Sequence, residues 1–165
     1  MFALIFGLSF LANAQDVQNN QPKGYQFTDI KRLPANSVKD QARAGTCWAW
    51  SGISFFESEM IRMGKEPIDL SAMYIVRHAY SDKATKFVRL HGNMNFAVGG
   101  AFCDVMHVIQ NYGIVPMDVY KGLNYGEPNH AFGEIDDVLA GYINAVIKNS
   151  NKKLSTAWKQ GFDGI

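Results

Sequence analysis

The stretch QARAGTCWAW, residues 41–50, holds the residue types of this sequence that are best suited to covalent chemistry. Cys47 follows a glycine-threonine turn and precedes an apolar run without proline, a pattern that predicts the start of a helix. A thiolate is the reactive form of cysteine, and the partial positive charge at a helix N-terminus favours it. Cys47 is therefore the candidate nucleophile.

Two neighbours of Cys47 are suited to support its attack on a carbonyl carbon. Gly45 has no Cβ atom, so a substrate can approach the backbone closely at the turn. The free N–H groups at a helix start, joined by a side-chain amide, can bind the oxyanion that such an attack creates. Gln41, upstream of the turn, is the candidate amide donor.

The elements that must position these residues are predicted to be helices, since apolar residues recur at helical spacing and strand signals are few. The chain, 165 residues long with ordinary apolar and charged fractions, is sufficient for one globular domain. The expected helices are 47–63 before Gly64, 71–82 with Ser71 as N-cap, one with the stripe Phe102, Val105, Met106, Ile109 and Tyr112 before Gly113, one with the stripe Ile135, Val138, Leu139, Tyr142, Ile143 and Val146, and the start of another in 155–165.

The candidate nucleophile segment resembles the active-site segment of papain-like cysteine peptidases. The matching positions are Gln41, Gly45, Cys47, Trp48 and Ser51. Two further motifs follow in the order of that family: DLSAMYIV resembles the opening of its second helix, and VGGAFCDVMHVIQNYGIVP resembles its paired-glycine segment with the helix after it.

Within that family, the sequence resembles the bleomycin hydrolase and aminopeptidase C branch. The interval between LSAMY and the paired glycines is long, and the later segment ends in YGIVP. Papain's closer relatives have a disulfide between two positions that are Ala44 and Ala97 here.

The resemblance implies an α+β, mostly helical chain: the left domain of a papain-like fold, with the β-rich right domain absent. It implies that Cys47 is the nucleophile, Gln41 an oxyanion-hole donor, and Trp48 structural. Gly99 and Gly100 would be the edge that hydrogen-bonds an extended peptide, since glycines let a peptide approach without meeting a Cβ atom. The alternative for these glycines is an ordinary loop before a helix.

Cysteine catalysis of this kind also needs an imidazole and a third group that orients it. His78 and His107 lie inside expected helices, and His91 lies in the loop before the paired glycines. We interpret all three as surface or packing residues.

His130, in NHAF, superficially resembles the histidine-alanine-apolar segment that supplies the family's general base. It follows Pro128 at the start of an amphipathic helix, however, whereas the family's histidine sits on a strand of the β-rich domain, and the asparagine-serine-tryptophan segment expected after it is absent. Asn129 is better interpreted as the cap of that helix. We therefore expect this chain to end before the domain with the catalytic histidine and asparagine, and to be inactive alone.

The remaining cysteine, Cys103, lies in a helical pattern, where a buried, inert thiol is expected. A disulfide between Cys47 and Cys103 is the alternative in an exported protein. A thiol redox protein is disfavoured because the sequence has no C-x-x-C pair.

The predicted organisation is a signal peptide at 1–14, a flexible lead-in at 15–26, and the left domain at 27–165, incomplete at its C-terminus. The signal peptide predicts export to the periplasm or the extracellular space. A buried N-terminal segment is the alternative, since the apolar run is too short to cross a bilayer, and no later stretch resembles a membrane span. The net charge of +1, without a basic stripe, gives no support for nucleic-acid binding.

The sequence thus predicts the N-terminal part of an exported cysteine peptidase, an aminopeptidase or a broader peptide hydrolase. The resemblance implies peptide substrates, the missing C-terminal β-rich domain and a homo-oligomer, a hexamer in this branch, as partners; no metal or organic cofactor is implied. Without the β-rich domain, the surface of the left domain that this domain would cover should be exposed and apolar. The alternative is a non-catalytic half-domain that binds peptides or a partner chain through Gly99 and Gly100.

Overall fold

The structure is a computed structural model that describes residues 24–25, 27–150 and 153–165. The predicted signal peptide and most of the predicted lead-in lie outside the described residues. The chain divides into two units, residues 1–32 and 33–165. In the first unit, the described residues are exposed and contain no helix or strand, and the rings of Tyr25 and Phe27 contact each other with centroids 6.4 Å apart.

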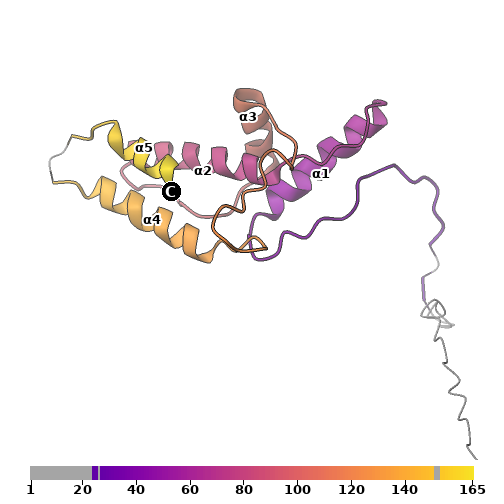
Figure 1. The fold of residues 1–165 in the computed structure, drawn as a ribbon, viewed down its shortest axis with the longest axis horizontal. Coiled ribbons are helices and arrows are strands. Elements are labelled where there is room, and N and C mark those ends of the chain that lie inside the picture. Colours follow the sequence, from indigo (N-terminus) through magenta and orange to yellow (C-terminus); the bar gives the residue numbers. More distant parts are fainter. Residues whose placement is uncertain (1–23, 26, 151–152) are drawn as a thin grey trace, which may run out of the picture. The chain divides into compact units, whose positions relative to one another are not determined.

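The second unit is built from helices (Figure 1). They are α1 (Cys47–Arg62), α2 (Ala72–Arg89), α3 (Phe102–Tyr112), α4 (Gly133–Ile147) and α5 (Ala157–Gly164). The described residues contain no strand, only isolated bridges between Arg43 and Ala131 and between Leu70 and Pro116. The expectation of a mostly helical chain is confirmed. No helix in the described ranges is long and apolar enough to span a membrane.

The central element of this unit is α2, which packs against each of the other helices. In Figure 1 it runs through the middle of the unit, with α3 and α4 on opposite sides of it. Each helix contributes apolar side chains to one shared core, in which the largest fully buried ones are Ile53, Ile75, Val105, Val108 and Ile143. The helix that begins at Cys47 is therefore fixed from one side by a common core.

The start of α2 was predicted correctly and its end was not. Ser71 is the N-cap, and its hydroxyl accepts a hydrogen bond from the Tyr74 N–H at 3.0 Å. The helix does not end near Asp82 but continues to Arg89. The added turns bury apolar side chains in the core, and no glycine or proline interrupts the chain before Gly92.

The start of α4 corrects another expectation. Asn129 does not cap this helix; the N-cap position is Phe132, without a side-chain hydrogen bond. The Arg43 N–H donates to the His130 carbonyl at 2.9 Å, and the Phe132 N–H donates to the Arg43 carbonyl at 3.3 Å. These bonds keep residues 130 and 131 beside the segment that leads to Cys47, so the helix begins after them.

A buried carboxylate joins the segments that precede α1 and α2. Glu57, on α1, is 2% exposed, and it accepts hydrogen bonds from Lys39 Nζ at 2.6 and 2.5 Å and from the Leu70 N–H at 2.7 Å. Lys39 also pairs with Asp69 at 2.9 Å. A charge this deeply buried needs such partners, so Glu57 ties both segments to the middle of α1.

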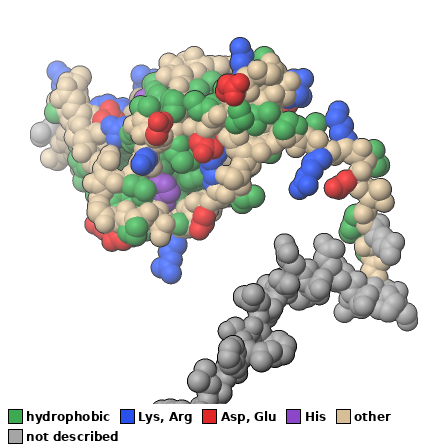
Figure 2. Space-filling view, turned by 45° about the vertical axis from the view of Figure 1, so that its right-hand side comes forward, with side chains coloured by type: hydrophobic (Ala, Val, Ile, Leu, Met, Phe, Trp, Pro, Cys, Tyr) green, Lys and Arg blue, Asp and Glu red, His purple; other side chains and the backbone are tan. Residues whose placement is uncertain are grey.

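Surface charge is mixed on the face drawn in Figure 2. Acidic and basic side chains are interspersed there with apolar ones. This distribution agrees with the small net charge of the sequence, +1.

Candidate active site

Cys47 is the first residue of α1, and its side chain is exposed with a free thiol. The preceding Thr46 is buried, and its carbonyl accepts from the Ala49 N–H at 2.9 Å. Its hydroxyl oxygen accepts from Trp50 Nε1 at 3.2 Å, which fixes the first turn of the helix. Within the described residues, the N–H groups of Cys47 and Trp48 have no hydrogen-bond partner. An exposed thiol and unpaired helix N–H groups therefore lie together.

Gly45 occupies a position that only glycine fits without strain. Its φ is +63°, in the left-handed region, and a Cβ atom placed there would lie 3.0 Å from Cγ2 of Val98. The turn before the thiol is thus in close contact with the segment that carries the paired glycines. This contact joins two motifs that are far apart in the sequence.

Trp48 makes a second connection between the same motifs. Its ring Nε1 donates to the Val98 carbonyl at 3.0 Å, and the side chain is only 7% exposed. A Cβ atom on Gly100 would lie 2.5 Å from Cε2 of Trp48, so the backbone at Gly100 rests directly on the indole. Gly99 differs, because a Cβ atom there would have no neighbour within 4 Å.

Gln41 lies in the turn that leads to this site. Its carbonyl accepts from the Ala44 N–H at 3.2 Å, and Ala42, between them, has a φ of 51°. Its side-chain amide has no hydrogen-bond partner in the part of the chain that the structure describes. The structure therefore brings Gly45, Cys47 and Gly100 together through Trp48 and Val98, and leaves the amide of Gln41 unpaired beside them in the chain.

Lys83, on α2, belongs to this arrangement and was not predicted. Its ammonium group donates to the Ala97 carbonyl at 3.2 Å and to the Gly99 carbonyl, and it lies 5.6 Å from the ring centroids of both Trp48 and Tyr80. Partial burial lowers the pKa of this lysine. In the sequence, Lys83 is only a lysine next to the core positions of α2. Such a lysine usually extends into solvent, so the pattern did not predict its contacts with these carbonyls.

His78 and His107 do not serve Cys47. The ring of His78 stacks on Tyr112 with centroids 4.3 Å apart, and His107 Nε2 lies 3.1 Å from a carboxylate oxygen of Asp82. Burial, then the nearby Arg77, lowers the pKa of His78. His91 is exposed in the loop after α2. No hydrogen bond joins any of these rings to the Cys47 thiol.

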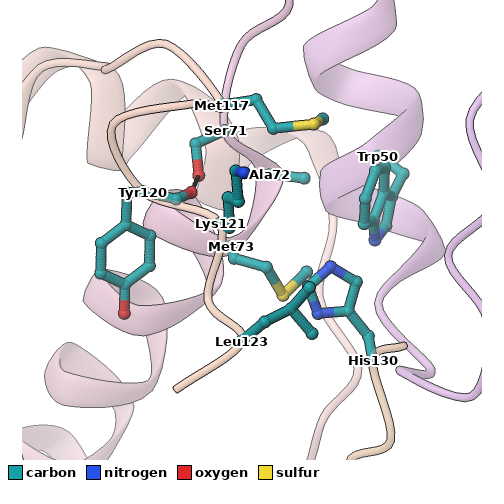
Figure 3. Close-up of a pocket in the computed structure, with 9 residues that line it drawn as sticks. All are labelled: Trp50, Ser71, Ala72, Met73, Met117, Tyr120, Lys121, Leu123 and His130. Atoms are coloured by element: carbon teal, nitrogen blue, oxygen red, sulfur yellow. Dashed lines mark hydrogen bonds between the residues drawn. The ribbon is translucent and has the colours of Figure 1, made fainter. Parts of the chain in front are cut away.

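His130 lies against the helix of the nucleophile without bonding to Cys47. Its ring is 9% exposed and is centred 5.6 Å from the ring of Trp50. Its Nδ1 is buried without a hydrogen-bond partner, and burial lowers its pKa. The ring lines a cavity of about 120 Å³, in which Figure 3 shows it next to Met73 and Leu123.

Cys103 corrects an expectation, because it is exposed rather than buried. It lies in the first turn of α3, and that helix directs Val105 and Val108 into the core, so position 103 faces away from it. Both thiols are free. The described residues contain no group of three or more His, Cys, Asp or Glu side chains arranged to hold a metal ion.

The family model described as papain family cysteine protease matches residues 22–156, which is most of the chain. No curated protein matches the chain.

Proposed function

The chain belongs to the papain family of cysteine proteases, and we propose on this premise that it carries the nucleophile and the peptide-binding edge of a peptide hydrolase. The observation that carries the proposal is the position of Trp48. This residue follows Cys47 directly, donates to the Val98 carbonyl and supports Gly100. The thiol and the paired glycines are thereby held in one place, as attack on a peptide bound along the glycines requires.

In the proposed reaction, the Cys47 thiolate attacks the carbonyl carbon of a peptide bond. The oxyanion that forms is held by the unpaired backbone N–H at the start of α1 and by the Gln41 amide. An imidazolium then gives its proton to the amine leaving group as the C–N bond breaks, and a thioester remains on Cys47. Attack by water on the thioester releases the acid and restores the thiol.

In the proposed scheme, the imidazole comes from outside the histidines described above. None of the four histidines of the sequence is hydrogen-bonded to Cys47. We propose that a β-rich second domain supplies it, as the family resemblance implies.

We further propose that the enzyme is an exported aminopeptidase of the bleomycin hydrolase and aminopeptidase C branch, acting on peptides and assembled as a hexamer. The long α2, which continues to Arg89, supports this branch, since it occupies the extended interval before the paired glycines. The apolar segment at residues 1–14 supports export.

A non-catalytic peptide-binding half-domain is the second candidate. It is favoured by one observation, the absence of a hydrogen bond between Cys47 and any of the four histidines. Such a protein would use the same Gly99–Gly100 edge but would give Cys47 no special reactivity.

Covalent labelling separates the two candidates. A peptidyl epoxide carries a backbone for the glycine edge, whereas iodoacetamide reports only thiol access, and both Cys47 and Cys103 are exposed to it. In the protein expressed from its own locus, we expect the epoxide to label Cys47 alone. Labelling should be lost in Cys47→Ser and retained in Cys103→Ser. Iodoacetamide labelling of both thiols without epoxide labelling would reject the peptidase and leave peptide binding.

A further inference from the structure

We infer that Lys83 is a positioning residue that holds the peptide-binding edge in its binding conformation. This inference rests on the proposed function, and it concerns a residue of α2 that lies outside the motifs of the family resemblance. The group it would serve is the backbone of an extended peptide substrate bound along Gly99 and Gly100.

Three successive carbonyls of the segment before Gly100 are bound by side chains from two helices. Lys83 Nζ donates to the carbonyl of Ala97, at 3.2 Å, and to the carbonyl of Gly99. Trp48 Nε1 donates to the carbonyl of Val98, at 3.0 Å. The segment contains no helix or strand that would fix it by itself. Its conformation therefore depends on these side-chain donors.

The backbone groups of Gly99 and Gly100 differ in whether they are already hydrogen-bonded. The Gly99 carbonyl is taken by Lys83, whereas the N–H groups of Gly99 and Gly100 and the carbonyl of Gly100 have no partner within the described residues. A peptide that adds as a strand needs unpaired N–H and C=O groups on its neighbour. Gly100 therefore has both groups available to a peptide, directly after the Gly99 carbonyl that Lys83 binds.

The surroundings of Lys83 show that carbonyls, rather than a carboxylate, are its partners. It forms no ion pair in the part of the chain that the structure describes, and its ammonium lies 5.6 Å from the ring centroids of Trp48 and Tyr80. The charges that influence its pKa, less strongly than its burial does, are those of Asp104, Asp136 and Lys86. A partly buried cation is costly unless its donors are satisfied, so its two carbonyl bonds fix its position.

The test compares two reagents on Lys83→Met and on Lys86→Met, the matched control from an exposed position of the same helix. Losing the charged donor should raise the inhibition constant KI of the peptidyl epoxide at Cys47 about tenfold. The iodoacetamide rate at Cys47 should stay within about twofold of wild type, because that reagent needs no edge. Lys86→Met should match wild type with both reagents.

Two further variants keep the inference testable if Lys83→Met does not fold. Lys83→Arg retains a charged donor and should restore much of the epoxide affinity, whereas Lys83→Gln is too short to reach both carbonyls and should raise KI. A wild-type KI in Lys83→Met or Lys83→Gln would overturn the inference. So would an equal loss of iodoacetamide and epoxide rates, which would place the effect on the thiol. Failure of the epoxide to label the wild-type protein would instead reject the proposed function.

Discussion

The backbone at Gly100 is in contact with the indole of Trp48, and a Cβ atom at Gly100 would come within 2.5 Å of Cε2. Trp48 follows Cys47 in the chain, so this contact sets the position of the glycine edge relative to the thiol. Two residues that look unrelated in sequence are therefore one structural unit at the candidate active site.

The first prediction compares alanine at the two adjacent glycines. Gly100→Ala forces the indole or the backbone to move and should lower the free energy of unfolding by about 1–3 kcal/mol. Gly99→Ala meets no atom within 4 Å and should change it by less than about 0.5 kcal/mol. Urea unfolding followed by tryptophan fluorescence measures both. Equal losses in the two variants would contradict the contact with Trp48.

The second prediction separates backbone strain from close approach at Gly45. Gly45 and Gly64 both have left-handed φ angles, +63° and +76°, but only Gly45 has a neighbour, Cγ2 of Val98 at 3.0 Å from the added Cβ atom. Alanine in the left-handed region costs about 1–2 kcal/mol. Gly64→Ala should therefore lower the free energy of unfolding by that amount, and Gly45→Ala should lower it by more. The difference between their urea midpoints reports the Val98 contact. If the two midpoints coincide, the turn does not press on Val98.

The local pattern of the sequence was enough for the elements that carry the site. The turn before Cys47, the N-cap Ser71 and the stop at Gly113 are local signals, and they set the start of α1, the start of α2 and the end of α3. Helix boundaries of this kind depend on neighbouring residues, so they can be predicted from one sequence.

Contacts between distant segments could not be predicted in the same way. The bonds between Arg43 and residues 130–132 displace the start of α4 from Asn129, and no periodicity announces them. Lys83 is a similar case, since its partners are backbone carbonyls of a loop. The exposure of Cys103 depends on which face of α3 packs against the core. The apolar stripe alone does not fix the rotation of the helix closely enough to decide whether position 103 is buried.

The third prediction concerns the buried carboxylate of α1. Glu57→Ala leaves the Leu70 N–H without its acceptor and Lys39, whose side chain is 17% exposed, without its main partner. Removing one member of a buried pair costs about 3–5 kcal/mol, because the other group stays desolvated. Glu59→Gln, in the exposed pair with Arg62, is the matched control and should unfold like wild type. Urea denaturation of both variants gives the comparison.

A double-mutant cycle with Lys39→Met shows how much of this loss of stability comes from the pair between Lys39 and Glu57. Removing Lys39 as well should recover part of the stability of Glu57→Ala, since no ammonium then remains with only the half-exposed Asp69 as its partner. Strict additivity of the two single variants would mean that Leu70 alone accounts for the effect.

The fourth prediction is a loss of stability in weak acid that depends on His130. Burial lowers the pKa of His130 in the folded chain below the ordinary value of 6.5, and it lowers that of His78 as well. A base with a lowered folded pKa binds its proton more readily when unfolded, so its contribution is complete above about pH 6.5 and is lost as the pH falls through the folded pKa. The free energy of unfolding should therefore decrease as the pH falls below about 6.5.

The variant that tests this pH dependence is His130→Leu. It removes the buried Nδ1 that has no partner and leaves His78 in place, so the decrease in acid should become smaller without vanishing. Adding His78→Leu should reduce it again. Urea titrations at several pH values measure these slopes, since each gives the free energy of unfolding directly. A slope in His130→Leu equal to that of wild type would mean that the ring stays hydrated in the cavity beside Trp50 and carries its proton equally well in the folded and the unfolded chain.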